Sequence, residues 1–181
     1  MKREADVKSQ ANTGKNITRR IAKDAVLLAI ALIIFIVEAQ IPFIPSVPGI
    51  KLGLSNVVSL YAMYKLGKSD TLMILLLRIL IAGIYTGQAV SILFSLSGGM
   101  CCFLVMLALV RFIPVRQAWV TSIFAAIAHN IGQITVAVFI LGSVSVLLYL
   151  PVLIVSAVVT GAATGLVAQG VMIRMEKIRL S

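Results

Sequence analysis

The stretch TLMILLLRILIAGIYTGQAVSILFSLSGGMCCFLVMLALV, residues 71–110, decides the fold of this chain. Arg78 is its one charged residue, and the uncharged connection GIYTGQ divides it into two apolar segments at about residues 70–85 and 89–112. The hydrocarbon core of a bilayer is about 30 Å thick, so a helix needs about 20 apolar residues to cross it. The stretch therefore predicts two neighbouring transmembrane helices joined by a short turn.

The composition of the whole chain also indicates a membrane protein. Of its 181 residues, 60% are hydrophobic and 12% are charged, whereas soluble domains carry about 25% charged residues. The formal net charge is +10, but the basic residues occur in short clusters between apolar runs. They do not form the basic stripe interleaved with aromatic residues that is typical of nucleic-acid binding. We therefore expect an integral membrane protein that contacts the lipid bilayer and no nucleic acid.

The same length criterion predicts an all-α bundle of about six transmembrane helices. They cover approximately residues 23–41, 52–66, 70–85, 89–112, 117–141 and 144–173. Lys and Arg gather before the first helix and after the second, fourth and sixth, whereas the other connections carry only Lys51. Positive residues stay on the cytosolic side of a membrane, so we expect both termini in the cytosol and the chain in the plasma membrane. The predicted parts are a basic N-terminal tail at 1–22, a transmembrane domain at 23–173 and a C-terminal tail at 174–181.

Two ionisable residues, Glu38 and Arg78, fall inside predicted transmembrane helices. A charge that faces lipid costs several kcal/mol, so such residues face a cavity or one another. Two interpretations stay open. The residues form an ion pair that joins two helices, or one or both line a polar binding cavity.

A second polar group lies in AHNIGQI, residues 128–134. His129 and Gln133 are one helical turn apart on one face, and Asn130 points away from them by about 100°. Hydrogen bonding between membrane helices is one interpretation of these side chains. The other interpretation is that they line the same cavity as Glu38 and Arg78.

The segment IPFIPSVPGIKLGLSN, residues 41–56, is predicted to lie on the outer face as a stiff, non-helical cap over that cavity. A loose outer turn is the alternative. Lys51 and Arg78 would contact an anionic or carbonyl-rich group of a substrate, and Phe, Met and Leu side chains would accept an apolar body. The candidate substrate-binding residues are therefore Lys51, Asn56, Glu38, Arg78, Gln88, His129 and Gln133.

The sequence offers little for catalysis or for a metal. AMYKLGKS, residues 62–69, matches a relaxed phosphate-loop pattern, but a working phosphate loop follows a strand and opens a helix. Here the pattern falls at the end of a predicted membrane helix and is better interpreted as a basic cytosolic turn. Cys101 and Cys102 are adjacent within an apolar run, which is typical of packing residues. We expect no catalytic residue, no cofactor and no metal site.

Small residues four apart allow a second helix to approach closely, and two such pairs occur. Gly161 and Gly165 are interpreted as packing inside the bundle. Ala25 and Ala29 stand on the first helix beside the basic tail, where an external protein partner competes with internal packing.

Five pieces occur in order along the chain: PGIKLGLSNVVSLYAMYKLG, LLRILIAGIYTGQ, LFSLSGGM, AHNIGQI and YLPVLIVSAVVTGAATG. Together, over about residues 38–170, they resemble the Gx transporter family, whose members often bear the label heptaprenyl diphosphate synthase component I. Prenyl-chain elongation needs magnesium held by aspartate-rich motifs. This chain has only Asp6, Asp24 and Asp70, widely separated and at or outside the predicted membrane boundary. We therefore do not expect it to catalyse prenyl transfer.

The family is similar in size, six-helix layout and cytosolic termini to the substrate-binding S components of energy-coupling factor (ECF) transporters. The resemblance implies a transmembrane coupling subunit and two ATPase subunits as partners. It also implies that Ala25 and Ala29 pack against the coupling subunit and that residues 42–51 cap the substrate pocket.

The leading hypothesis is a substrate-binding subunit of an ATP-driven importer for a small amphipathic molecule, such as an isoprenoid, a quinone precursor, a flavin or a vitamin-like compound. One alternative is a non-catalytic accessory or scaffold subunit of a prenyl diphosphate synthase or redox complex. A self-sufficient secondary carrier is the third hypothesis.

Overall fold

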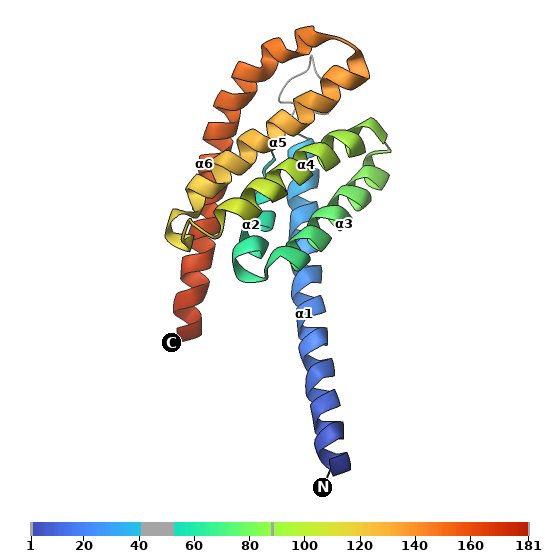
Figure 1. Cartoon of the computed structure of the whole chain (residues 1–181), viewed down its shortest axis with the longest axis vertical. Helices are drawn as coiled ribbons and strands as arrows, with labels where there is room; N and C mark the ends of the chain where they lie inside the picture. The colour runs from blue at the N-terminus through green and yellow to red at the C-terminus, as the bar shows by residue number, and fades with distance from the viewer. Residues whose placement is uncertain (1, 41–52, 88, 181) are drawn as a thin grey trace.

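The computed structural model describes residues 2–40, 53–87 and 89–180, and within them the chain is helical with no strand. This confirms the all-α prediction. The elements are α1 (Lys2–Ala39), α2 (Asn56–Lys65), α3 (Lys68–Thr86), α4 (Ala89–Leu109), the 3-10 turn η1 (Val115–Gln117), α5 (Ala118–Leu141), the 3-10 turn η2 (Val144–Tyr149) and α6 (Leu150–Leu180) (Figure 1).

Four segments of the described chain are long and apolar enough to cross a membrane. They are Lys68–Thr86, Ala89–Leu109, Val115–Leu141 and Val144–Ile178. The protein is therefore a multi-pass membrane protein. The helix α2 is shorter than its predicted segment at 52–66, because Gly53 has a positive φ of 76° and the helix begins only at Asn56. Its 10 residues span about 15 Å, which is half of a bilayer core.

A glycine lies at each end of α3. Gly67 separates α2 from α3 with a φ of 104°, and Gly87 closes α3 with a φ of 65°. Residues with a Cβ atom rarely adopt a positive φ, so a glycine at these positions allows the chain to change direction sharply. The phosphate-loop pattern at 62–69 falls on this first reversal between two helices and follows no strand. It therefore lacks the backbone arrangement that binds phosphate.

The helix α5 is the centre of the bundle, and α4 and α6 pack along it more extensively than any other pair of elements in the described chain. On the α4 side, a Cβ atom on Gly132 would lie 2.7 Å from the carbonyl oxygen of Ser97. On the α6 side, a Cβ atom on Gly165 would lie 2.5 Å from the Cα atom of Trp119, and one on Gly161 would lie 2.8 Å from the Cα atom of Ile123. Gly161 and Gly165 therefore pack inside the bundle, which confirms the interpretation of this pair from the sequence.

The N-terminal part of α1 extends beyond the bundle, and it begins at the end of the molecule where α6 also finishes (Figure 1). At this end Arg20 of α1 forms an ion pair with Asp70 of α3, and Lys65 of α2 lies 3.4 Å from Glu176 of α6. Asp24 and Asp70 are widely separated along the chain, but in the structure their carboxylates are close enough to interact electrostatically. Arg20 binds Asp70 through two nitrogen atoms. The carboxylate of Asp70 is therefore already paired where Asp24 comes close to it.

The α5–α6 contact predicts that alanine substitutions at two glycines of α6 differ in their effect on thermal stability. Replacing Gly165 with Ala places a methyl group against the backbone of α5, whereas Gly170 has nothing within 4 Å of the same position. Overpacking of this kind costs about 1–3 kcal/mol, so we expect Gly165→Ala to lower the thermal unfolding midpoint in detergent by about 2–10 °C. The matched control, Gly170→Ala, should leave the midpoint within about 2 °C of the parent. Equal midpoints for the two variants would contradict this account of the packing.

Candidate functional site

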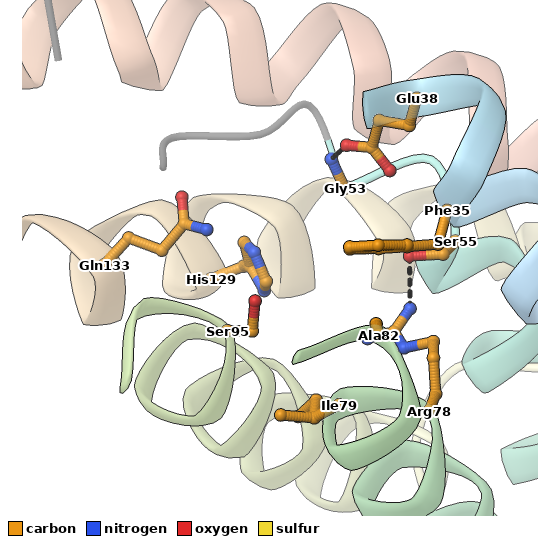
Figure 2. Close-up of a pocket in the computed structure, with 10 residues that line it drawn as sticks. All are labelled: Phe35, Glu38, Gly53, Ser55, Arg78, Ile79, Ala82, Ser95, His129 and Gln133. Atoms are coloured by element: carbon orange, nitrogen blue, oxygen red, sulfur yellow. Dashed lines mark hydrogen bonds between the residues drawn. The ribbon is translucent and has the colours of Figure 1, made fainter. Parts of the chain in front are cut away.

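A cavity forms where five parts of the chain converge. The residues that line it come from α1, from the segment before α2, and from α3, α4 and α5 (Figure 2). They are Phe35, Glu38, Gly53, Ser55, Arg78, Ile79, Ala82, Ser95, His129 and Gln133. Convergence of polar side chains from separate helices of a membrane bundle is typical of a binding site, because each buried polar group must be stabilised against an apolar surrounding.

The two charged residues of the lining both hold the short segment that leads into α2. The backbone N–H of Gly53 donates a hydrogen bond to Oε1 of Glu38 on α1. The guanidinium of Arg78 on α3 donates a hydrogen bond to Oγ of Ser55 (Figure 2). The sequence left open whether Glu38 and Arg78 pair with each other or line a cavity. In the structure both line the cavity, and each also fixes the chain at the start of α2.

Three neutral polar side chains are deeply buried, two of them in the cavity wall and that of Asn56 beside it. Gln133 is 1% exposed, His129 is 5% exposed and Asn56 is 8% exposed. Oε1 of Gln133, Nδ1 of His129 and Oδ1 of Asn56 have no hydrogen-bond partner within the described chain. Burying such an atom without a partner costs about 1–3 kcal/mol. Among the described residues, the cavity wall and its edge therefore hold three unsatisfied polar atoms.

Close packing of α4 against α5 determines where two of these side chains lie. His129 and Gln133 are one turn apart on α5, and both project toward the cavity (Figure 2). A Cβ atom on Gly98 of α4 would lie 2.9 Å from Cε1 of His129 and 2.9 Å from Cγ of Gln133. Any larger residue at position 98 would therefore push these side chains out of place.

Asn56 and His129 both lie close to Gly53. A Cβ atom on Gly53 would lie 2.8 Å from Nδ2 of Asn56 and 3.9 Å from Cδ2 of His129. The positive φ of Gly53 and the lack of space both favour glycine at this point.

The apolar part of the wall is small, and so is the space it encloses. Phe35, Ile79 and Ala82 provide its apolar surface. The volume open to the centre of a water molecule is about 20 Å³, which is enough for one or two waters. In this conformation the cavity is too small for the body of a large ligand.

The structure brings together most of the candidate residues. Glu38, Arg78, His129 and Gln133 line the cavity, and Asn56 lies beside it. Lys51 and Gln88 lie outside the described residues. Asn130 points away from the cavity and donates a hydrogen bond from Nδ2 to the carbonyl oxygen of Leu153 on α6, at 2.8 Å. It therefore joins two helices, which is one of the two interpretations given for this motif.

Sequence reasoning missed several lining residues, chiefly Phe35, Ser55 and Ser95. Ser55 precedes a helix and Ser95 lies in an apolar stretch with glycines, so each looks like an ordinary structural serine. Phe35 is on the same side of α1 as Glu38, since a spacing of three residues places side chains on one helix face. That spacing was the one available signal.

Removing the hydroxyl of Ser55 should show how much the bundle depends on its contact with Arg78. Arg78 is buried and donates to Ser55, so Ser55→Ala leaves a buried guanidinium short of one partner. The loss is expected to be about 1–3 kcal/mol in the free energy of unfolding, measured by urea or thermal unfolding in detergent micelles. Ser145→Ala, at an exposed position of η2, is the control and should change nothing measurable. A Ser55→Ala protein as stable as the control would show that this contact contributes nothing.

Comparison with known proteins places the chain in a family. A family model described as heptaprenyl diphosphate synthase component I matches residues 27–171. No curated protein and no solved structure matches the chain. The matched region contains the whole lining of the cavity, from Phe35 to Gln133. The chain therefore belongs to the heptaprenyl diphosphate synthase component I family, which is the Gx transporter-like family.

Proposed function

We propose that this protein is the membrane substrate-binding subunit, similar to an S component, of an ATP-driven ECF-type importer. Its substrate would be a small amphipathic molecule such as an isoprenoid, a quinone precursor, a flavin or a vitamin-like compound. The observation that carries the proposal is the cavity inside the bundle. Polar side chains from α3, α4 and α5 meet there, and Nδ1 of His129 and Oε1 of Gln133 have no hydrogen-bond partner within the described chain.

The composition of the cavity supports binding in preference to prenyl transfer. Chain elongation on a diphosphate needs several carboxylates to hold magnesium. Among the described lining residues the one carboxylate is Glu38, and it accepts a hydrogen bond from Gly53. Asp70 pairs with Arg20, and Asp24 is close enough to interact with both, so neither carboxylate belongs to the cavity lining. We therefore assign this chain a non-catalytic role.

The surface of α1 supports a protein partner at one end of the bundle. Ala25 and Ala29 are exposed and one turn apart. In a membrane bundle such a pair leaves a shallow surface on which another helix can pack closely. We propose that the transmembrane coupling subunit of the importer binds here and that the two ATPase subunits join the complex through it.

Charge supports an orientation with this end in the cytosol. The exposed residues Arg19, Arg20 and Lys23 lie on α1, and Arg174 and Lys177 lie on the last turns of α6. Both groups are at the end of the molecule where the chain begins and finishes (Figure 1). By the positive-inside rule we propose that both termini face the cytosol and that the protein resides in the plasma membrane.

The family description itself favours a second candidate, a non-catalytic accessory subunit of a prenyl diphosphate synthase or redox complex. The two proposals differ in the proteins that accompany the chain. We expect affinity purification from native membranes in a mild detergent, followed by mass spectrometry, to recover an ECF-type coupling subunit and ATPase subunits. Recovery of a soluble prenyl synthase or redox subunits without these proteins would favour the accessory role and overturn the importer.

Substitutions on α1 should separate assembly from substrate binding. Ala25→Trp and Ala29→Trp place a large ring on the proposed contact surface, so we expect at least a tenfold loss of co-purified coupling subunit, equivalent to about 1.4 kcal/mol or more. Binding of a co-purified small molecule should be unchanged, because neither residue lines the cavity. Val37→Trp, exposed two turns beyond Ala29, is the matched control and should assemble normally. Normal assembly of both alanine variants would show that the partner binds elsewhere.

A further inference from the structure

The unsatisfied polar atoms of the bundle are not spread evenly. Five buried side-chain nitrogen or oxygen atoms lack a hydrogen-bond partner within the described chain. Two of them belong to His129 and Gln133, which line the cavity, and a third belongs to Asn56, which lies beside it. Each of these three residues is more than nine-tenths buried. Native proteins leave few such atoms, and a cluster of them needs an explanation. A ligand that supplies their missing hydrogen bonds provides one.

The formal charges of the wall give the second observation. Among the described lining residues, Glu38 and Arg78 carry opposite charges that cancel. Both also bind the chain before α2 through Gly53 and Ser55. Burying a further anion without a surplus positive charge is costly in an apolar surrounding. The described wall therefore favours a ligand group with no net charge.

The identity of the three neutral residues defines that group further. Asn56 and Gln133 present carboxamides, which accept hydrogen bonds through oxygen and donate them through nitrogen. His129 presents a ring nitrogen that does either, depending on its tautomer. A planar group with adjacent donors and acceptors, such as an amide or a cyclic ureide, satisfies all three.

From these observations we infer that the cavity binds the uncharged, planar, amide-like head group of the substrate through Asn56, His129 and Gln133. This inference rests on the proposed function and narrows its substrate class. Sequence reasoning favoured an anionic or carbonyl-rich group held by Lys51 and Arg78. The described part of the wall, which excludes Lys51, favours substrates with a lactam, imide or carboxamide head over those with a carboxylate or a diphosphate. The cavity has a volume of about 20 Å³ that is open to the centres of water molecules, so in this conformation only a small part of a substrate would enter it.

A pair of probes that differ only in charge tests the inference. We would measure binding of 4-hydroxybenzamide and of 4-hydroxybenzoate to the full chain in lipid nanodiscs by isothermal titration calorimetry at pH 7. The expected result is that the amide binds at least tenfold more tightly than the carboxylate. Equal or tighter binding of the carboxylate would overturn the neutral head group while leaving an importer possible.

The variant Gln133→Leu distinguishes a ligand-binding role of Gln133 from a structural role, because the two roles predict different effects on stability. The substitution keeps much of the volume and removes a buried oxygen without a partner, so the ligand-free protein should be at least as stable as the parent. Binding of 4-hydroxybenzamide should weaken about tenfold. Thr135→Val is the control, since Thr135 is exposed on the same helix and bonds to the carbonyl oxygen of Ile131. Clear destabilisation by Gln133→Leu would mean that Gln133 is held by the protein itself, and the inference would fail.

His129→Phe provides a second variant for the case in which Gln133→Leu does not fold, with the same expected loss of amide binding. Native mass spectrometry of the chain purified from its own membranes then separates the two levels of proposal. A co-purified neutral amide or imide supports both. A co-purified carboxylate or diphosphate overturns the head-group inference and supports substrate binding. An empty protein that binds neither probe and recovers no importer subunits overturns both.

Discussion

The close approach of α5 to its two neighbours is the constraint on which the rest of this structure depends. Glycines at positions 98 and 132 bring α4 against α5, and Gly161 and Gly165 bring α6 against its other side. Lipid is as apolar as the side chains, so association of helices in a membrane relies on such close contacts in place of water exclusion. The contact between α4 and α5 also sets the position of His129 and Gln133. The shape of the cavity therefore depends on the packing of these helices.

The charged side chains within the bundle make different contacts from the neutral polar side chains. Glu38 and Arg78 hold a backbone N–H and a serine hydroxyl at the start of α2, so their burial contributes to the position of that helix. The side-chain amides of Asn56 and Gln133 and the imidazole of His129 each have an atom without a hydrogen-bond partner in the described chain. The two charged side chains therefore position the chain before α2, and the inferred ligand site uses the neutral groups. Arg78 also lines the cavity, so its predicted contact with substrate stays a prediction.

The family name raises an apparent conflict, because it refers to a synthase while the fold is a membrane bundle. The conflict is resolved if the name describes a component of a larger assembly. The described acids do not form a carboxylate cluster at the cavity, and the exposed pair Ala25 and Ala29 offers a surface for another membrane protein. Importer and accessory subunit share these features, which is why the identity of the partners decides between them.

The sequence by itself determined the helical class, the membrane setting and the identity of most polar cavity residues. Long apolar runs have few stable alternatives in a bilayer, and ionisable or amide side chains within them must face inward. It did not determine the short α2, the approach of Asp24 to Asp70, or the contributions of Phe35, Ser55 and Ser95. These depend on how distant segments meet, and only the tertiary structure decided which atoms found partners. Helical periodicity fixes the face on which a side chain lies, whereas a hydrogen bond requires the neighbouring helix to be in place.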